Sequence, residues 1–264
     1  MNKLSALMLL FLTSCSVAAY SGRMTPLPPG LTLQEVEQRH HLIYRGSNAQ
    51  ELDKTKGTCN GFVVSETMIY TAEHCVKKLY PFLEDGRPLE KLVSLHEQDI
   101  AILGTDTIET AVREAPVYTG KLDIGDEAYI VVQTSQENKR ELLRDFPKQV
   151  RQISPELLEI KGEILAYHPK ITSFDSSCNK IPAVDLFFID APGRLGFSGS
   201  PVFVKRDREY YLFGLGRSVR IPGHSFCNGI VAQDNAITFS VIPNPPYTEL
   251  VRVDEQKKDK NARN

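Results

Sequence analysis

Short runs of β-branched, aliphatic and aromatic residues, each bounded by turn-forming residues, recur through most of this 264-residue chain. Strands are typically this short, whereas a parallel α/β sheet needs longer helical patterns between its strands. The runs therefore predict an all-β protein, either a barrel or a sandwich. They lie at 61–64, 68–70, 99–103, 128–132, 157–160, 186–189, 201–204, 210–213 and 236–239.

Helices are expected at few places in this pattern. A short helix between 31 and 45 would lead into a strand at His41–Tyr44. The charged segment 136–156 predicts either a helix at Gln136–Leu143 or a long surface loop. Tyr247–Val253 predicts a short C-terminal helix.

The N-terminus predicts export. Lys3 precedes an apolar run at 4–12, which is shorter than the roughly 20 residues of a membrane span but typical of a signal peptide. The following Leu-Thr-Ser-Cys resembles the lipobox of bacterial lipoproteins, in which the cysteine, here Cys15, is lipidated. We therefore expect a lipid anchor in the cell envelope, facing the periplasm or the outside. The alternative is cleavage after Ala19, which would release a soluble protein.

The net charge and the number of cysteines further restrict the class of protein. A net charge of −2 disfavours a nucleic-acid binder, which usually carries a basic face. The chain has five cysteines, and lipidation of Cys15 leaves four. Four cysteines suffice for two disulfides in an oxidising compartment, with three possible connectivities. The four are Cys59, Cys75, Cys178 and Cys227.

Three segments carry candidate catalytic residues. They read Thr-Ala-Glu-His-Cys around His74, Asp-Ile-Ala-Ile-Leu from Asp99, and Gly-Phe-Ser-Gly-Ser-Pro around Ser198. A serine hydroxyl becomes a useful nucleophile only when a neighbouring base takes its proton. Asp85 and Asp106 are rival acids, but neither is followed by Ile-Ala-Ile-Leu.

Together these segments resemble the trypsin-like (chymotrypsin-fold) serine peptidase family over about 57–245, with a nucleophile motif closer to the bacterial members. The resemblance implies two packed six-stranded antiparallel β-barrels, with the active site between them. His74 would be the general base, Asp99 would orient it, and Ser198 would be the nucleophile. The backbone N–H groups of Gly196 and Ser198 would form the oxyanion hole. The resemblance implies no metal or organic cofactor, and we expect a monomer.

The resemblance also implies a Cys59–Cys75 disulfide beside the catalytic histidine. Cys178 and Cys227 would then form a second bridge near the specificity pocket. The alternative for the first pair is a zinc site on Cys59, His74 and Cys75, which lacks the usual short Cys-x-x-Cys spacing and a fourth ligand.

Substrate preference depends on residues around the nucleophile. Pro192 stands where trypsin has the aspartate of its pocket, so a strict preference for Lys or Arg is not expected. Gly214, Gly216 and Arg217 are candidates for the pocket wall. Arg217 or His224 would favour an acidic side chain, unless Arg217 points to solvent. The histidines other than His74 are expected at the surface or in loops.

Phe197 precedes the nucleophile, where the digestive enzymes have an aspartate that binds a newly freed N-terminus. That activation switch cannot operate here in the same form.

The sequence therefore predicts an exported serine endopeptidase acting on proteins or peptides. The alternatives are a catalytically silent trypsin-like binding protein and a serine esterase with the same triad. We expect a signal peptide with lipobox at 1–15, a flexible tether at 16–30, a peptidase domain at 31–253 with its barrel boundary near 120–135, and a disordered polar tail at 254–264.

Overall fold

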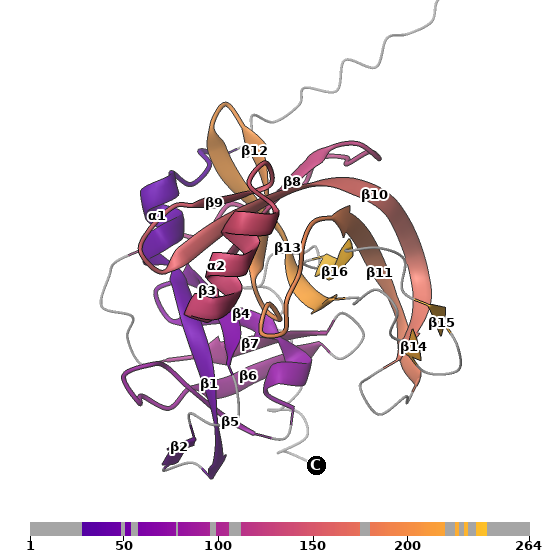
Figure 1. Cartoon of the computed structure of the whole chain (residues 1–264). Coiled ribbons are helices and arrows are strands. Elements are labelled where there is room, and N and C mark those ends of the chain that lie inside the picture. Colours follow the sequence, from indigo (N-terminus) through magenta and orange to yellow (C-terminus); the bar gives the residue numbers. More distant parts are fainter. Residues whose placement is uncertain are drawn as a thin grey trace, which may run out of the picture.

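The protein is described by a computed structural model in which two large antiparallel sheets lie side by side (Figure 1). It describes residues 28–48, 51–53, 58–77, 79–95, 99–105, 112–174, 180–219, 225–226, 230–231 and 236–241. The predicted signal peptide, lipobox, C-terminal helix and polar tail lie outside these residues.

The first sheet contains seven strands, in the order β2-β1-β3-β4-β7-β6, with β5 paired to β1. Its strands are β1 (His40–Asn48), β2 (Glu51–Asp53), β3 (Cys59–Ser65), β4 (Met68–Ala72), β5 (Tyr80–Phe82), β6 (Glu90–Leu95) and β7 (Ile100–Gly104). The central strands β3, β4 and β7 are buried almost throughout. Apolar side chains of one face, including Ile43, Val63 and Leu103, form the core of this half.

The second sheet closes on itself. Its order is β11-β16-β13-β12-β8-β10-β9, and β10 also pairs with β11, so six strands form a closed barrel to which β9 is added. These strands are β8 (Glu127–Gln133), β9 (Val150–Gln152), β10 (Leu157–Phe174), β11 (Lys180–Asp190), β12 (Pro201–Arg206), β13 (Glu209–Val219) and β16 (Ala236–Val241). The long, curved β10 and β11 lie along one side of the molecule (Figure 1). A further ribbon of two short strands joins β14 (Ser225–Phe226) to β15 (Ile230–Val231).

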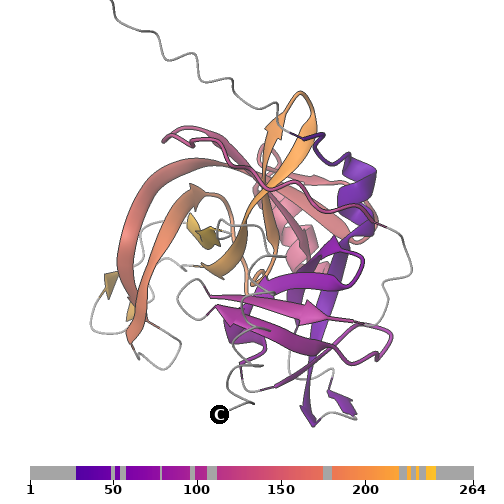
Figure 2. The same cartoon turned by 180° about the vertical axis from the view of Figure 1, so that it is seen from behind.

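A shared core joins the two sheets. Phe62 of β3 contacts Phe203 of β12 edge to face, with ring centroids 5.3 Å apart, and Phe203 contacts Tyr210 in the same way at 5.5 Å. Such pairs contribute roughly 0.5–1.5 kcal/mol beyond the area they bury. Helix α1 (Leu33–Gln38) lies against the β12–β13 hairpin, as both views show (Figure 2). Aromatic packing in this shared core therefore holds the two sheets together.

The two helices follow local capping signals. Thr32 and Glu35 form a capping box at the start of α1, and the Ser135 side chain caps α2 (Gln136–Asp145). The segment after Ser135 is therefore a helix and not a surface loop. Within the described residues, no helix is long and apolar enough to span a membrane.

The predicted all-β architecture of two packed antiparallel barrels is confirmed. Each of the short apolar runs overlaps a strand. Six strands of each sheet match the predicted count, and the three-residue strands β2 and β9 each add one more at a sheet edge. Such short edge strands carry too little pattern to be recognised in a sequence.

Candidate active site

His74 lies in a one-turn 3₁₀ helix, Glu73–Cys75, that directly follows β4. Cys75 is buried and forms a disulfide with Cys59 of the neighbouring strand β3. The pairing expected from the resemblance is therefore present, and a loop of 16 residues is worth about 3 kcal/mol on the chain-entropy model. Because both sulfurs are in the disulfide, neither can be a zinc thiolate. The other two cysteines of the predicted second bridge lie outside the described residues.

Asp99 holds both the backbone and the ring of His74. Its Oδ1 accepts from the His74 backbone N–H at 2.9 Å, and its Oδ2 lies 2.8 Å from His74 Nδ1. The backbone carbonyl of Asp99 also accepts from the Glu73 N–H at 3.0 Å. Asp99 has a φ of 57°, in the left-handed region that Asp and Asn tolerate better than most side chains. The rival Asp85 instead pairs with Arg87 on the surface, and Asp106 lies outside the described residues.

Ser198 occupies a tight turn that aims its hydroxyl at His74. Ser198 Oγ lies 2.9 Å from His74 Nε2 and 3.3 Å from the Arg217 backbone carbonyl. Asp99 is an acceptor when ionised, so His74 Nδ1 carries the ring proton and Nε2 faces the serine as an acceptor. Positive φ values of 93° at Gly196 and 79° at Gly199 shape the turn on either side of the serine. The structure thus brings together the three residues of the predicted triad.

The N–H groups of Gly196 and Ser198 have no hydrogen-bond acceptor among the described residues. By contrast, the neighbouring N–H groups of Phe197 and Gly199 donate to backbone carbonyls, at 3.3 Å and 2.6 Å. Two unpaired donors beside a nucleophile are what an oxyanion hole requires, because they are free to bind a negative oxygen.

Arg217 contradicts the expectation that its side chain points to solvent. Only 5 % of its side chain is exposed, and its Nε lies 3.1 Å from Asp99 Oδ2. Burial lowers the pKa of Arg217, and Asp99 opposes this shift. An arginine stays protonated in proteins, so the pair places a positive charge against the acid of the triad. The other two guanidinium nitrogens of Arg217, Nη1 and Nη2, are buried without a hydrogen-bond partner among the described residues.

The other predicted pocket residues lie close to the nucleophile turn or within the barrel. Gly216 accepts from the Gly199 N–H and donates to the Ser200 carbonyl at 2.8 Å, so it braces the turn. Gly214 is buried in the sheet, opposite Val202 of β12. Pro192 is buried in the segment that leads into the turn. His224 lies outside the described residues.

Asn60 reaches the nucleophile turn from β3 and was not among the predicted site residues. It is fully buried, and its Nδ2 donates to the Gly196 carbonyl at 2.7 Å. Its backbone N–H donates to the Ser198 carbonyl at 2.8 Å. The sequence signal is a polar residue directly after the disulfide cysteine, at the start of an apolar strand.

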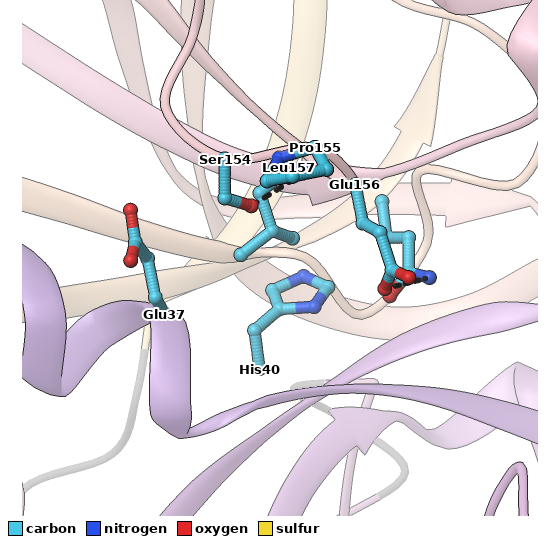
Figure 3. A pocket seen from close by; sticks show the side chains of 7 residues that line it. Glu37, His40, Ser154, Pro155, Glu156 and Leu157 are labelled. Atoms are coloured by element: carbon cyan, nitrogen blue, oxygen red, sulfur yellow. Dashed lines mark hydrogen bonds between the residues drawn. The ribbon is translucent and has the colours of Figure 1, made fainter.

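A small pocket lies between β1 of the first sheet and the segment that leads into β10 of the second sheet. Figure 3 shows the ring of His40 between Glu37 and Glu156, below Ser154 and Leu157. His40 is only 8 % exposed, so the expectation of a surface or loop position was wrong for this histidine. It begins β1, whose pairing with β3 turns it inward.

Burial of His40 predicts a pH-dependent stability. Burial lowers the pKa of His40 from 6.5 to about 3, because the imidazolium is poorly solvated there. Between these values the unfolded chain binds a proton that the folded protein does not, so the free energy of unfolding falls as the pH decreases. The slope is about 1.4 kcal/mol per pH unit, or on the order of 2 kcal/mol at pH 5.

Urea unfolding at pH 7 and pH 5 measures this loss. In a His40→Asn variant, the difference in the free energy of unfolding between pH 7 and pH 5 should be smaller than in the wild type by that amount. An equal pH dependence in the variant and the wild type would contradict a neutral, buried His40.

Comparisons with known proteins support the fold. No protein-family model matches the chain, and no curated protein matches its sequence. Among solved structures, the active form of the Rv3671c protease from M. tuberculosis superposes with a TM-score of 0.51, at 12% identity, over 89% of each chain. The inactive form of the same protease gives a TM-score of 0.50 at 14% identity, over 79% of this chain and 85% of that one. The chain therefore has the chymotrypsin-like all-β fold.

Proposed function

We propose that this chain, a chymotrypsin-like double barrel, is an exported serine endopeptidase. One observation carries the proposal: an unbroken line of hydrogen bonds from Asp99 Oδ2 to His74 Nδ1, at 2.8 Å, and from His74 Nε2 to Ser198 Oγ, at 2.9 Å. This order of acid, imidazole and hydroxyl activates a serine for attack on an acyl carbon. The N–H groups of Gly196 and Ser198 support the same chemistry.

The proposed reaction runs through an acyl-enzyme. Ser198 Oγ bonds to the peptide carbonyl carbon while His74 Nε2 takes its proton, and the carbonyl oxygen becomes an anion that accepts from the Gly196 and Ser198 N–H groups. His74 then passes the proton to the amine nitrogen as the C–N bond breaks. Water repeats the sequence to release the acid and restore the serine. Asp99 stabilises the imidazolium in both halves.

The expected substrates are proteins or peptides. Pro192 stands where trypsin has its pocket aspartate, so a strict preference for Lys or Arg is not proposed. Arg217 remains a candidate for the pocket wall, because Asp99 contacts its Nε while its Nη1 and Nη2 have no hydrogen-bond partner among the described residues.

A fluorophosphonate probe tests the proposal directly. The purified protein should be labelled, and labelling should disappear in Ser198→Ala and in His74→Ala. Glu66→Ala, at an exposed turn between β3 and β4, is the matched surface control and should label like the wild type. A folded wild-type protein that stays unlabelled would argue for a silent binding protein. Labelling with ester turnover but no cleavage in a peptide library would argue for an esterase.

The proposal includes export and a lipid anchor on Cys15, which rest on the sequence and lie outside the described residues. A tether of polar and proline-rich residues before Gly30 suits a domain held near a membrane. Expressed in a bacterial host, the wild type should incorporate labelled palmitate and sediment with membranes. A Cys15→Ser variant should do neither. Equal palmitate incorporation in both would exclude this cysteine as the anchor.

A further inference from the structure

The nucleophile turn lacks the activation switch of the digestive enzymes, since Phe197 stands in place of the aspartate. The Phe197 side chain is 1 % exposed and packs in the apolar core of the second barrel. An apolar ring anchors the turn by packing, but it makes no hydrogen bond or ion pair that would orient the backbone. The orientation of the peptide groups on either side of Phe197 must therefore come from other contacts.

Asn60 supplies a directional contact. Its Nδ2 donates to the Gly196 carbonyl at 2.7 Å, across 136 residues of sequence, and its Oδ1 accepts from the Gln133 N–H at 2.9 Å. Only one orientation of the amide satisfies both bonds, because a carbonyl must receive a donor and an N–H must meet an acceptor. Asn60 therefore connects the turn to β8 of the second barrel.

The main chain of Asn60 holds the same region. Its N–H donates to the Ser198 carbonyl at 2.8 Å, and its carbonyl accepts from Thr71 Oγ1 at 2.7 Å on β4, the strand that leads to His74. Asn60 is fully buried, so water does not compete for these groups. One residue thus links the turn of Ser198 to the strand that positions its base.

The bond to Gly196 matters because a glycine does not hold its own conformation. Gly196 has a φ of 93°, and a Cβ at this position would meet only the Thr58 carbonyl, at 3.8 Å. Neighbouring atoms therefore leave space around this residue. A hydrogen bond to the Gly196 carbonyl therefore restricts the conformation of Gly196. The N–H of the same residue faces the reacting oxygen.

We infer that Asn60 is a positioning residue that locks the oxyanion hole through the Gly196 carbonyl, in place of a salt bridge to a freed N-terminus. This inference rests on the proposed serine-hydrolase function. It implies that contacts inside the domain organise the hole.

Asn60→Asp tests the lock most selectively. Ionised aspartate keeps the acceptor for the Gln133 N–H but removes the donor to the Gly196 carbonyl. We expect the maximal rate of fluorophosphonate labelling to fall about 100-fold, the typical effect of losing one oxyanion-hole donor, while the probe concentration at half-maximal rate changes less than twofold. Asn138→Asp, the same change on α2, is the matched control and should label like the wild type.

Asn60→Ala is the second variant, because a buried carboxyl group disturbs folding when it is charged and can still donate to the Gly196 carbonyl when it is protonated. It should show the same loss of labelling, with folding verified by circular dichroism. A folded Asn60 variant that labels at the wild-type rate would overturn the inference, as would a loss of labelling that comes only from a higher probe concentration at half-maximal rate. An unlabelled wild type would instead refute the proposed function.

A wild-type measurement covers the case in which neither variant folds. In a crystal structure of the diisopropyl fluorophosphate adduct, the phosphoryl oxygen should accept from the Gly196 and Ser198 N–H groups, with Asn60 Nδ2 still on the Gly196 carbonyl. A Gly196 carbonyl turned away from Asn60 in an adduct bound by both N–H groups would refute the lock.

Discussion

Replacing Asp99 by Asn should lower the second-order rate of fluorophosphonate labelling about 10⁴-fold, the typical effect of this change in a triad. Asn matches the size of Asp and tolerates the φ of 57° at this position, so the backbone should stay in place. An amide that turns its NH₂ toward His74 Nδ1 forces the proton onto Nε2. His74 could then no longer accept the proton of Ser198.

The same variant should also be less stable, because it leaves a buried cation without its partner. The Arg217 and Asp99 side chains are 5% and 6% exposed, and their 3.1 Å contact would be replaced by a neutral amide. Breaking a buried pair from one side costs about 3 kcal/mol or more. Urea unfolding should reveal this loss beside the loss of labelling.

A double variant separates the two effects. Asp99→Asn with Arg217→Met removes the unpaired cation, so stability should recover while labelling stays low. If Asp99→Asn alone labels within tenfold of the wild type, Asp99 is not the acid of the triad. If the double variant recovers no stability, the ion pair with Arg217 is not the cause of the loss.

Gly199→Ala should destabilise the fold by about 4 kcal/mol or more, because the turn after Ser198 has no space for a side chain. A Cβ there would lie 2.1 Å from the Asn60 carbonyl oxygen and 2.5 Å from Thr71 Oγ1. Both atoms belong to a mutual hydrogen bond of 2.7 Å in the buried core, so neither can move aside cheaply. The φ of 79° adds a conformational cost of its own.

Gly125→Ala is the matched control for that conformational cost. Gly125 has a φ of 92°, but a Cβ there would meet nothing within 4 Å. This variant should lose only about 1 kcal/mol. Denaturant midpoints compare the two variants, and equal midpoints would show that the turn does not lie this close to β3 and β4.

Features that depend on neighbouring residues could be predicted from the sequence. The alternation of apolar runs and turns predicts the strands, because a short continuous apolar run between turn signals is typical of a buried strand. Thr32 with Glu35 is a local signal for the start of α1. The motifs around His74, Asp99 and Ser198 are similarly short, and the structure brings these three residues together.

Contacts between residues that are distant in the sequence could be found only from the tertiary structure. Arg217 looks like a surface cation in sequence, yet it lies at an irregularity in the pairing of β13 with β16 and its Nε contacts Asp99. His40 looks polar and exposed, yet pairing of β1 with β3 buries it. No local rule states that Asn60 meets Gly196, because 136 residues separate them and only the packing of the two barrels joins β3 to the nucleophile turn. The sequence by itself thus determined the strands and the chemical groups of the candidate site. The tertiary structure decided which buried polar groups pair, since a buried donor or acceptor must find its partner wherever the folded chain places one.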